Sequence, residues 1–170
     1  LSIRRQRQMC IRDRFYHWRD AIGDRSERTP QPSWFWGGLY DNDVGTVEFI
    51  QFCRLVDAEP FICVNMLTAD AEEAADWVAY CNAPAGHHVG KLRARDGFAE
   101  PFGVTYWELD NETFRRFSPK QYAERCKEFA QAMKAVDPTI KIAIVGYDWY
   151  RWDIGAMLDI TGEHVNYVVD

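Results

Sequence analysis

The chain has 170 residues, of which 47% are hydrophobic and 27% charged, and its formal net charge is −6. It is long enough to bury one core and lacks the composition of a disordered protein. The longest apolar runs, at residues 61–64 and 142–145, are far shorter than the roughly 20 residues that cross a bilayer. An acidic chain is also poorly suited to bind nucleic acid. We therefore predict a globular protein that has neither a membrane nor a nucleic acid as its partner.

The first 14 residues differ in charge from the rest of the chain. They contain five Arg and one Asp and lack the apolar core of a signal peptide, and residues 9–14 resemble translated sequencing-adapter read-through. We expect residues 1–14 to be a non-native basic extension and residues 15–170 to form one domain. The alternative is a basic arm that binds nucleic acid or membrane.

The cysteines give little support to a metal site, because no two of them form a C-x-x-C pair. Cys53, Cys63 and Cys126 lie in apolar patterns, where a free cysteine usually behaves as a small hydrophobic residue. We expect buried thiols in a reducing compartment, and hence a cytoplasmic protein. No metal and no cofactor is predicted.

Predicted helices and strands alternate after an aromatic loop at residues 15–42. Thr46 can cap a helix whose apolar residues repeat at helical spacing as far as Val56. Residues 61–65 are short, apolar and partly β-branched, which is typical of a strand covered on both faces. Thr68 or Asp70 can cap the next helix, which extends to Cys81 before a loop at residues 82–90.

The second half of the chain continues this alternation. A helix is predicted to begin at Ser118-Pro119-Lys120-Gln121, which combines an N-cap, a proline at the first helical position and a capping-box glutamine. The other predicted elements are strands at residues 104–109, 141–145 and 165–169 and an amphipathic helical segment at residues 154–160.

Strands that alternate with helices predict an α/β fold with a parallel sheet. The sheet is either open and doubly wound or part of an eight-stranded barrel, and both place function at the carboxyl ends of the strands. Neither G-x-G-x-x-G nor G-x-x-x-x-G-K-[ST] occurs in the sequence, which removes most support for nucleotide binding.

The segment Tyr106-Trp107-Glu108-Leu109-Asp110-Asn111-Glu112 ends a hydrophobic strand in polar and charged residues. If the strand stays regular, Glu108, Asp110 and Glu112 share one side, with Asp110 and Glu112 about 6.6 Å apart. Such a separation is admissible for the two carboxylates of a glycosidase. From residue types alone, the alternative is a solvated acidic loop.

The same segment resembles the W-E-[IL]-G-N-E motif of the α-L-arabinofuranosidases of glycoside hydrolase family 51. Four further segments are similar to that family in the same order, so the resemblance covers nearly everything after Asp13. They are Tyr16-His17-Trp18-Arg19-Asp20-Ala21-Ile22-Gly23, Gly45-Thr46 with Glu48-Phe49-Ile50, Ala58-Glu59-Pro60-Phe61-Ile62-Cys63-Val64-Asn65, and Ala132-Met133-Lys134-Ala135-Val136-Asp137-Pro138.

The resemblance implies a retaining hydrolase with a (β/α)₈ TIM barrel, of which this chain supplies roughly strands 3 to 6 and is incomplete at both ends. Glu112, at the end of the fourth barrel strand, would be the general acid/base, and Asn111 would contact the sugar 2-hydroxyl. The nucleophile, a Glu on the seventh strand, lies outside the chain. The implied substrates are terminal α-L-arabinofuranosyl residues of oligosaccharides or polysaccharides that contain arabinose, and a homo-oligomer of the parent protein is left open.

Two other readings of the function stay open beside this one. One is a related barrel hydrolase that acts on xylosides or β-glucans. The other is a fragment without a nucleophile that only binds carbohydrate or is purely structural.

Further residues around the motif and in the preceding loops are candidates for the site. Asp110 replaces the usual Gly of the motif, and an ionised Asp110 would raise the proton affinity of Glu112. Trp18 could offer its ring to a sugar, as could Trp34 and Trp36 less directly, and the alternative is packing of this loop against the barrel rim. Asn65 could bind substrate at the end of its strand, or it could be a structural amide with all its hydrogen bonds satisfied.

Overall fold

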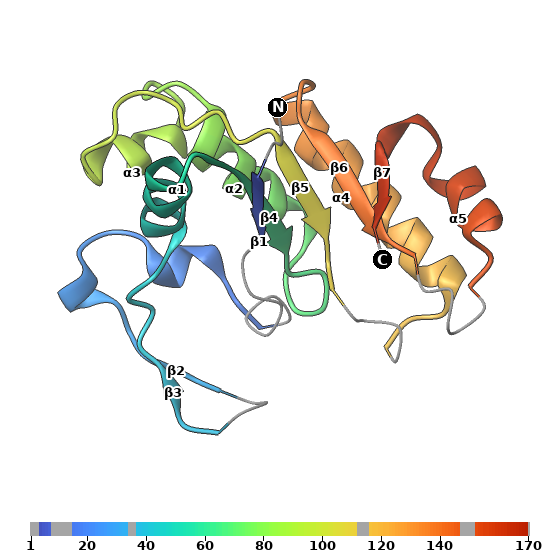
Figure 1. The fold of residues 1–170 in the computed structure, drawn as a ribbon, viewed down its shortest axis with the longest axis horizontal. Coiled ribbons are helices and arrows are strands. Elements are labelled where there is room, and N and C mark those ends of the chain that lie inside the picture. The colour runs from blue at the N-terminus through green and yellow to red at the C-terminus, as the bar shows by residue number, and fades with distance from the viewer. Residues whose placement is uncertain (1–3, 8–14, 34–36, 112–115, 147–151, 170) are drawn as a thin grey trace.

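The computed structural model describes residues 4–7, 15–33, 37–111, 116–146 and 152–169. Its centre is a parallel five-stranded sheet, with helices packed against it and a small two-stranded sheet at one side (Figure 1). The larger sheet consists of β1 (Arg4–Arg7), β4 (Ala58–Val64), β5 (Tyr106–Leu109), β6 (Lys141–Val145) and β7 (Tyr167–Val169), and the smaller one of β2 (Gln31–Pro32) and β3 (Leu39–Tyr40). The α-helices are α1 (Thr46–Leu55), α2 (Ala71–Asn82), α3 (Gly90–Arg95), α4 (Pro119–Val136) and α5 (Ile154–Thr161).

The strands follow one another in space as they do along the chain, in the order β1-β4-β5-β6-β7. A doubly wound sheet reverses its strand order at a switch point, whereas a (β/α)₈ barrel adds each strand beside the one before it. No reversal occurs among the described strands. The predicted α/β fold with parallel strands is confirmed, and the strand order favours a segment of a barrel wall.

Alternation of side chains along the strands explains where the core lies. Apart from Val145 at the end of β6, the strand residues in the core cluster are every second residue of three neighbouring strands. The register places them in two rows across the sheet: Ile62, Trp107 and Ile142 in one, Val64, Leu109 and Ile144 in the other. Because successive side chains of a strand point to opposite faces, both rows lie on one face. In Figure 1, helices α2 and α4 run behind this sheet.

Helix α4 begins where its sequence predicts. The Ser118 hydroxyl accepts a hydrogen bond from the Gln121 amide at 3.3 Å, and the Gln121 side chain accepts one from the Ser118 amide at 2.9 Å. These bonds satisfy two backbone donors that a helix start otherwise leaves open. Five residues of this helix that recur at helical spacing are all buried: Tyr122, Cys126, Phe129, Ala130 and Met133.

Helices α2 and α1 also begin with a cap, but the capping residue of α1 is not the one that was expected. Asp70 caps α2, where its carboxylate accepts from the Glu73 amide at 2.8 Å. For α1 the structure makes Gly45 the N-cap and Thr46 the first helical residue, because the Glu48 carboxylate reaches back to the Gly45 amide at 2.8 Å. The expectation that Thr46 is the cap was therefore wrong by one residue.

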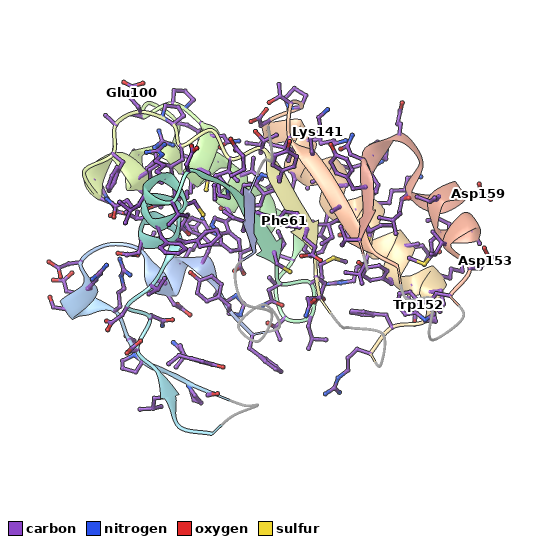
Figure 2. The ribbon with its side chains drawn as sticks, in the orientation of Figure 1. Phe61, Glu100, Lys141, Trp152, Asp153 and Asp159 are labelled. Atoms are coloured by element: carbon purple, nitrogen blue, oxygen red, sulfur yellow. The ribbon has the colours of Figure 1, made fainter. Side chains whose placement is uncertain are left out.

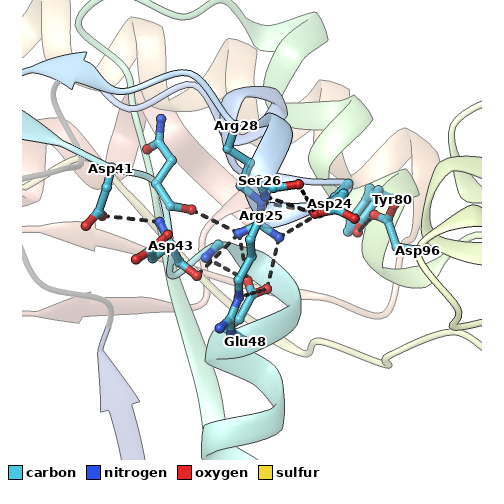
Figure 3. A network of polar contacts seen from close by, with 12 residues as sticks. Asp24, Arg25, Ser26, Arg28, Asp41, Asp43, Glu48, Tyr80 and Asp96 are labelled. Carbon is cyan, nitrogen blue, oxygen red and sulfur yellow. Dashed lines mark hydrogen bonds and ion pairs between the residues drawn. The ribbon is translucent and has the colours of Figure 1, made fainter.

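The loop that precedes α1 is held to the helix by a buried arginine (Figure 3). The Arg28 guanidinium donates to both carboxylate oxygens of Glu48, at 2.9 and 3.1 Å, and to the carbonyls of Gly23 and Asn42, each at 2.9 Å. Burial alone would raise the pKa of Glu48, but hydrogen bonds from Arg28 and from the Gly45 amide outweigh it and lower that pKa. The carboxylate is therefore ionised in the folded protein at neutral pH.

Strand β1 lies in the segment that we expected to stay outside the fold. Residues 4–7 pair in parallel with residues 58–61 of β4. Backbone hydrogen bonding needs no particular side chain, so even an arginine-rich segment can pair with an open sheet edge. Residues 4–7 thus extend the sheet, and the expectation that residues 1–14 are a non-native basic extension stays a prediction. In the described part of the chain, no helix is both long and apolar enough to cross a membrane.

Candidate active site

The carboxyl ends of the parallel strands meet at one edge of the sheet, and the candidate site is there. Asn65 follows β4, while Asp110 and Asn111 follow β5. Figure 2 labels Lys141 at the opposite, amino end of β6 and Trp152 toward the carboxyl end of the strands. All three polar residues are buried. The predicted acid/base, Glu112, lies outside the described residues.

Asp110 ends the regular geometry of β5. Its φ is +61°, in the left-handed region that L-residues rarely adopt and that Asp and Asn tolerate better than most. The regular strand therefore stops at Leu109, so the condition under which Glu108, Asp110 and Glu112 would share one side does not hold, and Glu112 itself lies outside the described residues. The conformation also gives a physical reason for the glycine that the resembling family motif has at this position.

The peptide unit between Leu109 and Asp110 is fixed from both sides. Its amide, on Asp110, donates to the Val64 carbonyl of β4 at 3.0 Å. Its carbonyl, on Leu109, accepts from the Tyr122 hydroxyl of α4 at 2.7 Å. The Asp110 carboxylate then accepts from the Asn111 amide at 2.6 Å. The backbone that leads into Asn111 is thus oriented by β4, by α4 and by its own preceding side chain.

Electrostatic effects place the Asp110 carboxylate near helix α4. Burial raises the pKa of Tyr122 well above its ordinary range, and the negative charge of Asp110 adds to the rise. Burial likewise raises the pKa of the Cys126 thiol, again with a contribution from Asp110. Tyr122 therefore keeps its proton and can donate to the Leu109 carbonyl. The predicted effect of Asp110 on Glu112 stays a prediction.

Asn65 has the hydrogen bonds of a structural amide. Its carbonyl oxygen accepts from the amides of Leu67 and Thr68 at 2.9 and 3.0 Å, and its amide donates to the Thr68 hydroxyl at 2.6 Å and to the Tyr16 carbonyl at 3.3 Å. The side chain is fully engaged in shaping the turn after β4. These bonds favour the alternative reading, a structural amide, and substrate binding by Asn65 stays a prediction.

The contacts of Trp18 favour the alternative reading, in which this loop packs against the barrel, and sugar binding by Trp18 stays a prediction. Its ring is 1% exposed, stacks on Trp77 at an interplanar angle of 12°, and donates its indole N–H to the Glu73 carbonyl at 3.1 Å. The ring therefore packs this segment against α2. Trp34 and Trp36 lie outside the described residues.

Two features of this edge were not found from the sequence. Tyr122 was not singled out from the sequence, although a tyrosine in an apolar helical pattern usually needs a partner for its hydroxyl when it is buried, which was a usable signal. The other is a pair formed by His17 and Glu73, in which the His17 Nδ1 lies 2.9 Å from each carboxylate oxygen. No local sequence signal could have found the pair, because its members are 56 positions apart.

Titratable groups elsewhere in the described residues do not form a metal site. No group of three His, Cys, Asp or Glu side chains there comes together as a metal ion would require. Cys53, Cys63, Cys81 and Cys126 are free and buried, which confirms the expectation of buried thiols.

Comparison with known proteins gives consistent matches over most of the chain. Residues 8–166 match the family model described as the alpha-L-arabinofuranosidase 1 domain. The chain is 36% identical to a probable alpha-L-arabinofuranosidase C from Aspergillus clavatus, over 81% of this chain and 28% of that protein. It is 30% identical to the intracellular exo-alpha-(1->5)-L-arabinofuranosidase 1 of Bacillus subtilis, over 90% of this chain and 33% of that protein.

The structural comparison agrees with the sequence comparison. The crystal structure of an alpha-L-arabinofuranosidase from Thermotoga maritima superposes with a TM-score of 0.90 at 32% identity, covering 97% of this chain and 35% of that one. This similarity confirms that the sheet is part of the barrel of that family, and the chain spans about a third of the length of the relatives it matches. The chain belongs to the alpha-L-arabinofuranosidase 1 domain family and is a partial (β/α)₈ barrel of glycoside hydrolase family 51.

Proposed function

We propose that the full-length protein that contains this chain hydrolyses terminal α-L-arabinofuranosyl residues from arabinose-containing oligosaccharides or polysaccharides, with retention of configuration. The observation that carries the proposal is the position of Asn111, directly after β5 at the carboxyl edge of a sheet that matches this family. Active sites of such barrels lie at this edge. The names of the relatives favour arabinofuranosides over xylosides or β-glucans.

Each residue of the motif has a distinct part in this proposal. Glu112 gives its proton to the leaving oxygen while a carboxylate from the rest of the barrel attacks the anomeric carbon. Glu112 then takes a proton from the water that releases the sugar. Asn111 contacts the sugar 2-hydroxyl, and its buried position in a backbone fixed by β4 and α4 supports that role. The reaction as proposed uses no metal and no cofactor.

The test is the Glu112→Gln variant of the full-length protein. We expect kcat/KM for arabinofuranosides with poor leaving groups to fall by about 10²- to 10⁴-fold, which is the usual contribution of a general acid, because kcat/KM reports only on the steps up to transfer of the sugar to the enzyme. Substrates whose leaving group needs no proton should lose much less. The matched control is Glu124→Gln, an exposed glutamate on α4 that forms an ion pair with Lys120. Near-normal rates for Glu112→Gln on substrates with poor leaving groups would contradict the assignment of Glu112 as the general acid/base.

Two experiments separate this proposal from its alternatives. A panel of arabinofuranosides, xylosides and β-glucans distinguishes the substrates. A full-length sequence without a Glu at the end of the seventh barrel strand would favour a protein that only binds carbohydrate. We also propose a cytoplasmic location, supported by the buried free thiols and by the intracellular relative in Bacillus subtilis. An oligomer of the full-length protein remains open to measurement.

A further inference from the structure

We propose that Tyr122 is a positioning residue for the reaction, and that its hydroxyl orients the end of β5, which leads into Asn111. This inference rests on the proposed function. It concerns a helix residue behind the sheet, which itself contacts no sugar.

The hydroxyl of Tyr122 joins the ends of two strands. It donates to the carbonyl of Leu109, the last residue of β5, at 2.7 Å. It also accepts from the amide of Val145, the last residue of β6, at 3.0 Å. A hydroxyl has one proton to give and lone pairs to accept with, so one group serves both strands at once. Residues 109 and 144 are paired across these strands, so the bridge lies where the paired region ends.

The bridged strand end leads directly into the catalytic motif. The same peptide unit of β5 is held on its other side by β4, where the Asp110 amide donates to the Val64 carbonyl. Between these two bonds the plane of the peptide is fixed, and the left-handed turn at Asp110 then sets the direction of Asn111. Loss of the hydroxyl would leave the β4 bond in place but would release the side toward α4.

The surroundings of Tyr122 make this bridge rigid. The side chain is buried, and its ring lies 5.4 Å from the ring of Trp152, which Figure 2 labels toward the carboxyl end of the strands. Burial raises the pKa of Tyr122, so the hydroxyl keeps the proton that it donates to Leu109. On the far side of the bridge, the Gly146 amide donates to the Val169 carbonyl at 2.8 Å, which connects the end of β6 to β7. The bridge therefore ties the motif to the remainder of the sheet.

The experiment uses Tyr122→Phe in the full-length protein and two aryl α-L-arabinofuranosides. One carries a good leaving group, 2,4-dinitrophenol, and the other a poor one, phenol. The quantity measured is kcat/KM, which reports on steps up to the transfer of the sugar to the enzyme. We expect kcat/KM for the phenyl substrate to fall about 10- to 100-fold, the range that a small misplacement of a catalytic group can cost. The dinitrophenyl substrate should lose less than about threefold, because its departure does not depend on a well-placed acid.

The matched control is Tyr80→Phe. Tyr80 is also a buried helical tyrosine with a bonded hydroxyl, which donates to Asp96 at 2.5 Å, but its partner lies directly after α3. Its removal should leave the ratio of the two kcat/KM values as in the unsubstituted protein.

Several outcomes would contradict the role proposed for Tyr122. An unchanged ratio in Tyr122→Phe, or an equal loss on both substrates, overturns the proposal. A Tyr122→Phe protein that fails to fold where Tyr80→Phe folds also overturns it, because the hydroxyl would then serve the fold alone. If the unsubstituted protein hydrolyses neither arabinofuranoside, the proposed function is wrong. That outcome differs from one in which the unsubstituted protein is active and Tyr122→Phe leaves the ratio unchanged.

Discussion

At the scale of single residues, Asp110 combines an uncommon backbone with a buried carboxylate. It has φ of +61° and no exposed surface. The left-handed conformation costs an ordinary L-residue about 1–2 kcal/mol, and glycine avoids this cost. We expect Asp110→Gly to be more stable than Asp110→Ala by about 1 kcal/mol, because both variants remove the carboxylate but only glycine relieves the backbone. Urea unfolding of the two full-length variants measures the difference, and equal stabilities would show that the backbone is not strained there.

Asp110 and its neighbours also show which features of the site could be predicted from the sequence and which could not. The motif around Asn111 was found from residue types and resemblance, and its place at the strand end was confirmed. The regular alternation failed because it assumes an extended backbone, and φ at residue 110 depends on bonds to Val64 and on its own side chain. The contacts of Trp18 and Asn65 differ in how far the sequence could have indicated them. Trp77, on which Trp18 stacks, is distant in sequence, so local patterns carry no information about it. Three of the four hydrogen bonds of Asn65 are to Leu67 and Thr68, so an Asx turn was a usable local signal there.

At the scale of elements, helix α1 and the loop before it depend on the ion pair between Arg28 and Glu48. Removing the Glu48 charge would leave the guanidinium, which is 3% exposed, without its charged partner. We expect Glu48→Gln to lower the free energy of unfolding by about 2–3 kcal/mol, the range for hydrogen bonds to charged groups. The control is Glu124→Gln, whose exposed pair with Lys120 at 3.7 Å should be worth less than about 0.5 kcal/mol. Comparable losses in both variants would contradict this account.

The same pair predicts how stability depends on pH. The folded pKa of Glu48 is lowered, so the folded state binds its proton less readily than the unfolded state does. Stability from this group is therefore present above the ordinary glutamate pKa, about 4.3, and is lost as pH falls through the lowered value. The free energy of unfolding of Glu48→Gln should therefore change less with pH in the acid range than that of the unsubstituted protein. The same unfolding measurement, repeated over a range of pH, tests this.

Elements differ in how well the sequence predicted them. Helix α4 and strand β6 begin where they were expected, because capping residues and an apolar run are local signals. Helix α3 was not predicted. Its Arg93 is buried and donates to the carbonyls of Tyr80, Cys81, Phe98 and Ala99, so the helix is stabilised by contacts with α2 and the following loop rather than by an apolar stripe. Strands β2 and β3 were not predicted either, and they pair with each other in antiparallel orientation.

At the scale of the whole molecule, the strand order resolves the alternative that the sequence left open. Right-handed β-α-β connections give the same alternation in open sheets and barrels, so the sequence could not separate them without the resemblance. The observed order, without reversal, and the match to family structures agree on a barrel. The chain covers about a third of those structures, so the outer edge of β7 has no paired strand among the described residues.

An open edge has a measurable consequence for the 170-residue chain produced alone. Unpaired backbone donors and acceptors on a sheet edge can pair with another copy, and a lysine on the edge opposes this. We expect the isolated chain to associate as its concentration rises, and Tyr167→Lys to reduce that association. Leu158→Lys is the matched control, because Leu158 on α5 is 40% exposed and Tyr167 on β7 is 41% exposed. Light scattering over a concentration series distinguishes the cases. If the isolated chain stays monomeric at every concentration, the open edge does not cause association. Equal effects of the two lysines would show that exposed apolar area, rather than the open edge of β7, drives association.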